Sequence, residues 1–219
     1  MRQRCRYFFG LLATVFAIGA CESSNESFVD GLALDEFTVL PTLSTLDLSK
    51  ISPASDPSYF ELWHGAQVPP EEAIGSSGEL CSQASNKPIC EQEFSLMRTS
   101  DAFEGVCDAD GCTSFILSNQ GSDNRFFIGT SGFVELFGPV DSFEEAAMIV
   151  ATKGYEWDSI ELSEGGYRQV EDGYQLLVQK LDLSSCSPSL MRRYLLHVGT
   201  DATVTVLEDE FLREISGCP

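Results

Sequence analysis

The alternation of apolar and polar residues in the last third of the chain constrains its fold most strongly. Tyr174, Leu176 and Val178 alternate with glutamines, and residues 192–198 repeat the pattern with Tyr, Leu and Val against Arg and His. Successive side chains of a β-strand point to opposite faces, so such strands bury one face and leave the other in water. That arrangement is typical of antiparallel sheets. The sequence therefore predicts an antiparallel meander here.

Turn residues divide this region into short strands. We expect the strands over residues 156–162, 167–170, 174–183, 192–198 and 203–207, and a last strand or frayed turn over 211–215. Further upstream, runs rich in aromatic and β-branched residues predict strands over 112–117, 125–128 and 133–137.

A helix is expected just before the meander, because Ser142 and Glu145 have the spacing of a capping box and Gly154 suits the helix end. Ser76 and Glu79 have the same spacing and predict a helix over 77–85. Pro88 then begins a second helix that runs to about residue 99. On that helix an apolar stripe is expected, formed by Cys90, Phe94 and Met97.

Together these elements predict an α+β fold, with an N-terminal helical hairpin and then one helix packed on an antiparallel β-meander. A helix followed by a meander is similar in order to cystatin-like and cone-shaped nuclear-transport-factor-like folds. Because one topology hosts many functions, this similarity implies no activity.

The first twenty residues have the pattern of a secretory signal. Arg2, Arg4 and Arg6 precede an uncharged stretch from Tyr7 to Ala20. That stretch is shorter than the roughly 20 apolar residues that span a bilayer. The alternatives are a soluble secreted protein and a retained membrane anchor. The bulky Ile18 argues against ordinary cleavage after Ala20, which favours small residues one and three places before the cut.

The signal ends in Ile18-Gly19-Ala20-Cys21, which resembles the lipobox of bacterial lipoproteins. The resemblance implies cleavage before Cys21, attachment of diacylglycerol to its sulfur and acylation of the new amino terminus, with palmitate as a typical acyl group. It also implies a place in the bacterial cell envelope, with the lipid in a membrane and the protein facing the periplasm or the exterior.

Three segments follow from this reading: the signal peptide over 1–20, the lipidated cysteine and a tether over 21–68, and a folded domain over 69–219. Residues 22–27 are small and polar, as suits a tether, and this linker reading is preferred to the glycosylation acceptor that Asn25-Glu26-Ser27 also fits. Prolines at 41, 53 and 57 interrupt long elements. The expected docking point of the tether on the domain is formed by Phe60, Leu62 and Trp63.

Six cysteines remain after Cys5 leaves with the signal and Cys21 takes lipid. An even number in an exported chain predicts disulfides. Local spacing favours three pairs, Cys81 with Cys90, Cys107 with Cys112, and Cys186 with Cys218. The alternative of a zinc site lacks the paired C-x-x-C spacing that it requires.

The charge of the chain excludes broad binding to nucleic acid. There are 34 acidic against 13 basic residues, for a formal net charge of -21, and the phosphates would be repelled. Loss of the signal removes three arginines and leaves a body that should stand off from anionic lipid. Arg192-Arg193 is the only adjacent basic pair in the sequence, and we expect it at a solvated sheet edge.

No residue pattern assigns catalysis, a cofactor or a metal. His64 and His197 are the only histidines, and the glycine–serine stretches at 75–78 and 129–132 lack the G-x-S-x-G spacing of a nucleophile elbow. Carboxylate pairs are too common in so acidic a chain to indicate a glycosidase-like site. The stretch from Cys107 to Gly111 fails the calcium-loop pattern, because a glycine at position 6 puts Val106 at position 1.

Residues 136–146, Asp172-Gly173-Tyr174 and the terminal Gly217-Cys218 resemble segments of a group of exported proteins of predatory and social soil bacteria, and this resemblance brings no activity with it. The expected function is a lipid-anchored envelope protein with a non-catalytic binding or assembly domain. Its partners would be the membrane, through the lipid, and an unidentified envelope protein. The alternatives are an envelope hydrolase with paired carboxylates, and an inhibitor of a secreted enzyme that uses the loop from Asp108 to Gly111.

Overall fold

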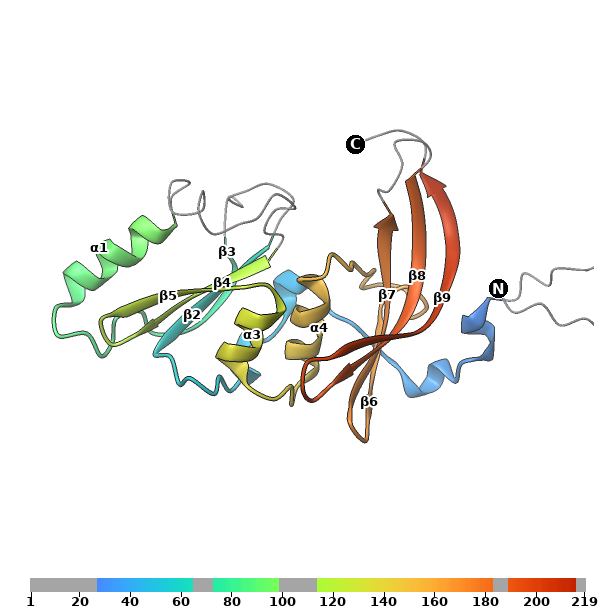
Figure 1. Ribbon diagram of the computed structural model, residues 1–219, viewed down its shortest axis with the longest axis horizontal. Helices are drawn as coiled ribbons and strands as arrows, with labels where there is room; N and C mark the ends of the chain where they lie inside the picture. Colours follow the sequence, from blue (N-terminus) through green and yellow to red (C-terminus); the bar gives the residue numbers. More distant parts are fainter. Residues whose placement is uncertain (1–26, 65–72, 99–113, 183–188, 216–219) are drawn as a thin grey trace, which may run out of the picture.

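The computed structural model describes residues 27–64, 73–98, 114–182 and 189–215, which form two antiparallel sheets and three α-helices (Figure 1). Successive layers stack along the long direction of the molecule. Helix α1 lies at one end, and the segment that follows residue 27 lies at the other. The fold is α+β and its sheets are antiparallel, as expected.

The larger sheet has five strands in the order β1-β6-β7-β8-β9. Four of them, β6 to β9, form the expected meander through antiparallel neighbours, and the two-residue β1 pairs with β6 at one edge. The bounds of these strands are β1 Thr38–Val39, β6 Gly166–Val170, β7 Gly173–Asp182, β8 Ser189–Gly199 and β9 Val204–Ile215.

The smaller sheet has four strands in the order β3-β2-β4-β5. Its strands are β2 Tyr59–His64, β3 Ala73–Gly78, β4 Ser114–Gln120 and β5 Asp123–Ile128. Strand β2 is internal, because it pairs with β3 on one side and β4 on the other. Two sheets therefore replace the single meander that the sequence predicted.

Helices α3 (Gly129–Phe137) and α4 (Phe143–Ala151) lie between the two sheets (Figure 1). The main core forms here. Phe60 and Leu62 of β2 face Phe133 of α3, Ile149 of α4 and Leu176 of β7 in one buried cluster. Helix α4 is buried from Glu144 to Ala151, which explains its run of alanines and aliphatic residues. This layer joins the two sheets into one body.

Two smaller clusters cover the outward faces of the sheets. Helix α1 (Lys87–Met97) packs Phe94 against Trp63 and Phe115 on the far face of the four-stranded sheet. On the far face of the five-stranded sheet, Leu177 and Leu195 are covered by residues 27–37. We call this face, which carries Leu177 and Leu195, the outer face. It was expected to be wet, but the apolar N-terminal segment packs on it.

The segment assigned to the tether thus contributes much of the fold. Residues 28–64 supply β1, β2 and four 3-10 turns, whose bounds are Phe28–Gly31, Leu34–Glu36, Leu43–Thr45 and Leu48–Lys50. The expected docking residues Phe60, Leu62 and Trp63 lie on β2, with the first two in the main core and Trp63 against α1.

Several local predictions are confirmed. Helix α1 begins with Pro88 in its first turn, and α4 has the complete capping box of Ser142 and Glu145. Strands β4 to β8 lie where short strands were expected. The runs 203–207 and 211–215 form the single strand β9.

Other predictions are wrong. In place of a helix over 77–85, the structure has the end of β3 and a turn, so the helical hairpin reduces to α1 in the described residues. Residues 133–137 belong to α3 because Phe133, Leu136 and Phe137 fall on one helical face. Residues 156–162 form one isolated bridge, from Glu156 to Gln179, and turns.

Candidate functional site

A polar hollow of about 350 Å³ lies at one end of the five-stranded sheet. The turn from β6 to β7 supplies one wall, and β8, β9 and their hairpin turn supply the other. The hollow is open to solvent and lined by Asp172, His197, Gly199, Thr200, Asp201, Thr203 and Thr205. Its side chains are thus carboxylates, hydroxyls and one imidazole.

Gly173 brings the two turns together. Its φ of +146° is unusual for other residues, and a Cβ there would lie 2.0 Å from the carbonyl oxygen of Val198. This close approach places Asp172 beside His197, whose Nε2 lies 3.1 Å from the carboxylate Oδ1. An imidazole held by a carboxylate can accept a proton from a bound group.

Asp201 carries negative charge at the hollow. Its Oδ1 accepts a 2.9 Å hydrogen bond from the backbone N–H of Thr203. Hydrogen bonds from Thr203 lower the pKa of Asp201 below its ordinary value, because they stabilise the ionised form. The hollow therefore suits a ligand group that donates hydrogen bonds or carries positive charge.

His64, the other histidine, ends strand β2 of the four-stranded sheet and does not line this hollow. Its Nδ1 is 2.7 Å from the Oγ of Ser114, its cross-strand partner on β4. A serine hydrolase also needs a carboxylate that orients the imidazole and donors that bind the oxyanion. The pair of Ser114 and His64 therefore does not by itself assign that activity.

A buried carboxylate on β2 is the charged group that the sequence analysis missed. Glu61 is 1% exposed and lies on the face of β2 that packs against α1. It accepts hydrogen bonds from Tyr59 Oη at 2.8 Å, Trp63 Nε1 at 2.8 Å and Arg98 Nε at 2.9 Å. Trp63 and Arg98 Nε donate to Oε1, whereas Oε2 accepts the bond from Tyr59 and one from Arg98 Nη2. An acid between apolar residues in Tyr-Phe-Glu-Leu-Trp was the available signal.

The neighbours of Glu61 respond to its charge. Burial is the main cause that raises the pKa of Tyr59, and its hydrogen bond to Glu61 raises that pKa further. Hydrogen bonding to Glu61 raises the pKa of Arg98 further above its already high value. Arg98 also lies over the ring of Phe94, 5.1 Å from its centroid. The cluster thus fixes the last turn of α1 on the four-stranded sheet.

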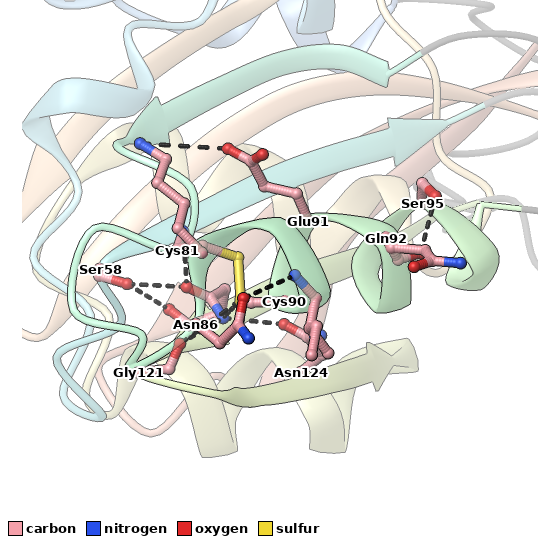
Figure 2. The surroundings of a disulfide bond; sticks show 12 residues. Ser58, Cys81, Asn86, Cys90, Glu91, Gln92, Ser95, Gly121 and Asn124 are labelled. Carbon is pink, nitrogen blue, oxygen red and sulfur yellow. Dashed lines mark hydrogen bonds and ion pairs between the residues drawn. A yellow bond between two sulfur atoms is a disulfide. The ribbon is translucent and has the colours of Figure 1, made fainter.

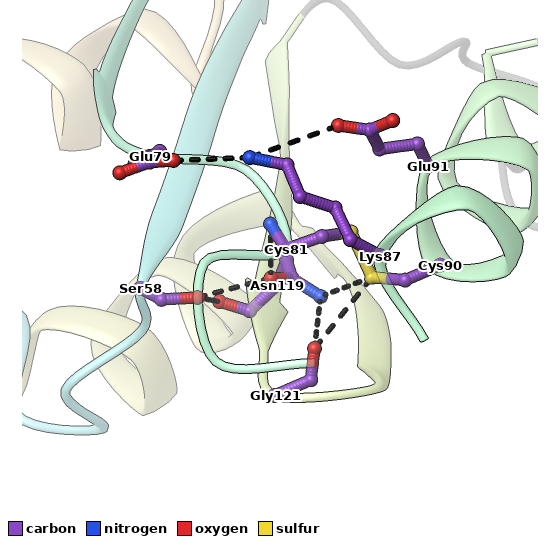
Figure 3. Close-up of polar contacts among 8 residues, drawn as sticks. All are labelled: Ser58, Glu79, Cys81, Lys87, Cys90, Glu91, Asn119 and Gly121. Atoms are coloured by element: carbon purple, nitrogen blue, oxygen red, sulfur yellow. Dashed lines mark hydrogen bonds and ion pairs between the residues drawn. A yellow bond between two sulfur atoms is a disulfide. The ribbon is translucent and has the colours of Figure 1, made fainter. Parts of the chain in front are cut away.

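The other end of α1 is held by the disulfide between Cys81 and Cys90, whose Cα atoms are 6.0 Å apart (Figure 2). Asn119 of β4 organises the surrounding loops (Figure 3). Its Oδ1 accepts hydrogen bonds from the Cys81 N–H and the Ser58 hydroxyl, and its Nδ2 donates to the Gly121 carbonyl. The bond between Cys81 and Cys90 confirms one of the three predicted disulfides.

Two buried glutamates begin α4. The Oε2 atom of Glu145 accepts the backbone N–H groups of Asp141 and Ser142 at 2.8 and 3.2 Å. Burial nevertheless raises the pKa of Glu145 to about 7, because desolvation penalises its charged form. Glu144 lies 3.7 Å from Lys50 Nζ. Glu145 thus completes the start of α4, whereas Glu144 Oε1 has an ion pair with Lys50 but accepts no hydrogen bond from the described residues.

The adjacent arginines differ from expectation. Arg193 is 8% exposed and pairs with Glu210 at 2.9 Å and with Glu164 at 3.7 Å on the outer face. Arg192 binds Asp209. The prediction of a solvated basic pair is wrong for Arg193, because the loop before β6 and the N-terminal segment cover this part of the sheet.

Several predicted site residues lie outside the described residues: Cys21, Cys107, Cys112, Cys186, Cys218 and the loop from Asp108 to Gly111. Within the part of the chain that the structure describes, no three His, Cys, Asp or Glu side chains gather as metal ligands. No family model, no curated protein and no solved structure matches this chain.

Proposed function

We propose that this chain is a lipid-anchored protein of the bacterial cell envelope, whose domain binds or assembles with a partner and carries out no catalysis. The structural observation that carries this proposal is the buried disulfide between Cys81 and Cys90. Disulfides form and persist outside the cytosol. The disulfide therefore supports export, for which Arg2 to Ala20 supply the signal and Cys21 the lipid attachment point.

The position of the N-terminal segment supports a short tether. Ser27 Oγ donates a 2.8 Å hydrogen bond to Glu210, and the Phe28 N–H donates to the same carboxylate at 3.1 Å. Ser27, which is held on the domain by this bond, follows Cys21 by six residues, and six residues span about 20 Å at most. No helix among the described residues is long and apolar enough to cross a membrane. In this proposal, the lipid on Cys21 supplies the membrane attachment.

The hollow between Asp172 and Asp201 supports a binding role. It is open, and its charged and hydroxyl-bearing side chains suit a polar partner better than an apolar one. The partner in this proposal is an envelope protein or another envelope component, facing the periplasm or the exterior with the domain.

Lipid attachment is tested by mass spectrometry of the N-terminal peptide from the native protein. We expect a peptide that begins at Cys21 and carries a diacylglyceryl group, and the Cys21→Ser variant should keep its full signal. A native peptide that begins at Met1, or at Cys21 with a free thiol, would overturn the proposal.

Binding is tested by crosslinking in envelope extracts, where Asp172→Asn and Asp201→Asn should lose partners that Asp123→Asn, on the other sheet, retains.

A further inference from the structure

Residues 27–37, the first described residues of the chain, pack on the outer face of the five-stranded sheet. Glu210 of β9 accepts hydrogen bonds from both Ser27 and Phe28. Immediately afterwards, Val29 and Phe37 are buried against Leu177 and Leu195. Burial of these two side chains removes apolar surface from water and stabilises the contact. The start of the domain is therefore fixed on this face.

The loop over residues 157–165 lies on the same face. Glu164 of this loop binds Gln179 and Arg193, and Arg193 in turn binds Glu210. Leu162 packs with the apolar cluster that the N-terminal segment forms. Two residues earlier, Ile160 is 82% exposed, the most exposed of the large apolar side chains in the described residues. The exposed apolar side chain of Ile160 thus belongs to a loop that packs with the N-terminal segment.

Helix α1 lies at the opposite end of the molecule (Figure 1). From residues 27–37 to α1, the order is five-stranded sheet, α3 and α4, four-stranded sheet, and α1. Adjacent layers pack about 10 Å apart, so four spacings place α1 about 40 Å from the N-terminal segment. Ile89 on α1 is 51% exposed and offers a comparable apolar side chain at this far end.

We propose that the outer face of the five-stranded sheet is turned toward the lipid bilayer and that α1 is held at the end away from it. This inference rests on attachment through Cys21, as proposed above. Six residues keep the outer face within about 20 Å of the lipid. Without the three arginines of the signal, 10 basic residues face 34 acidic ones, and this charge of about -24 opposes a flat arrangement on anionic lipid and favours standing on the tethered end.

The orientation is tested with a substitute anchor that replaces Cys21 and leaves the six later cysteines unchanged. The chain from Glu22 to Pro219, with six histidines before Glu22, is bound to vesicles of phosphatidylcholine and phosphatidylglycerol that contain nickel-chelating and dansyl-labelled lipids. Ile160→Trp and Ile89→Trp are compared, and the energy transfer of the wild type, from Trp63 and Trp157, is subtracted from each. Both sites are exposed isoleucines, so neither substitution should disturb the core.

We expect the excess transfer to the dansyl lipid to be at least threefold larger for Ile160→Trp than for Ile89→Trp. Equal transfer, or larger transfer from residue 89, overturns the proposed orientation. This result is independent of processing at Cys21, because the histidine anchor replaces the lipid. A free Cys21 in the native protein would refute the lipid attachment alone, so failures of the two proposals are distinguishable.

Discussion

Removal of the Arg98 side chain should destabilise the protein, because it leaves the buried Glu61 carboxylate without its counter-ion. Glu61 is 2% exposed at its side chain, and Arg98 is 37% exposed. Breaking a fully buried ion pair from one side costs about 3–5 kcal/mol. Water screens the exposed part of Arg98, and Tyr59 and Trp63 still donate to Glu61, so we expect a loss of about 2 kcal/mol for Arg98→Ala.

The measurement is the free energy of unfolding in urea, followed by circular dichroism, together with the thermal midpoint. For a chain of this size, a loss of 2 kcal/mol lowers Tm by about 4–8 °C. The matched control is Arg125→Ala on β5, whose partner Asp123 is 57% exposed, and its loss should stay below about 0.5 kcal/mol. Equal losses for the two variants would refute the reasoning, because burial of the carboxylate would then make no difference.

Three further predictions concern the disulfide, a glycine and a buried acid. Cys81→Ser with Cys90→Ser should lower the unfolding free energy by about 2–3 kcal/mol, because the closed loop is short; calorimetry that shows no loss would contradict this. Gly173→Ala should cost more than the same change at exposed Gly31, where a Cβ meets nothing within 4 Å, and unfolding in urea compares the two variants. The pKa of Glu145 is raised to about 7 in the fold, so its unfolded state loses its proton first as pH rises. Wild-type stability should therefore fall between about pH 4.5 and pH 7 relative to Glu145→Gln, and a Gln variant with an identical pH profile would contradict this.

Local sequence signals predicted individual elements well where the signal and the tertiary environment agree. The capping box at Ser142 and the proline at the start of α1 fix helix starts by local hydrogen bonds and backbone geometry. The same spacing at Ser76 failed, because residues 73–78 pair with β2 as an edge strand. Cross-strand pairing with a distant partner outweighed a capping signal that is only local.

The arrangement of the sheets could not be predicted from local patterns. Strand β2 was read as part of a tether because the prolines around it interrupt regular elements, yet its partners β3 and β4 follow later in the chain. The aromatic run at Phe133 was read as a strand, but it also fits one face of a helix. Such short apolar runs fit both periods, and only the packing between two sheets decides between them.

In the candidate sites too, contacts between residues close in sequence were predictable, and contacts between distant residues were not. The pairing of Cys81 with Cys90 was predictable, because their separation of nine residues brackets one turn. The contact of His197 with Asp172 was not, because it joins two turns of the meander through the strand register. Glu61 was overlooked because its counter-ion lies 37 residues away, beyond the reach of any local pattern.

The hydrogen bond between Ser27 and Glu210 joins residues 183 positions apart, and β1 likewise pairs with a distant strand, β6. In the export proposed above, the chain crosses the membrane from its amino end, so β1 is delivered long before its partner strand β6. Strand β2 can pair with β3 and β4 once those have followed, but β1 must remain unpaired until β6 of the meander emerges. Contacts of such long range slow folding. In that proposed route, the five-stranded sheet is complete only after nearly the whole polypeptide has been delivered.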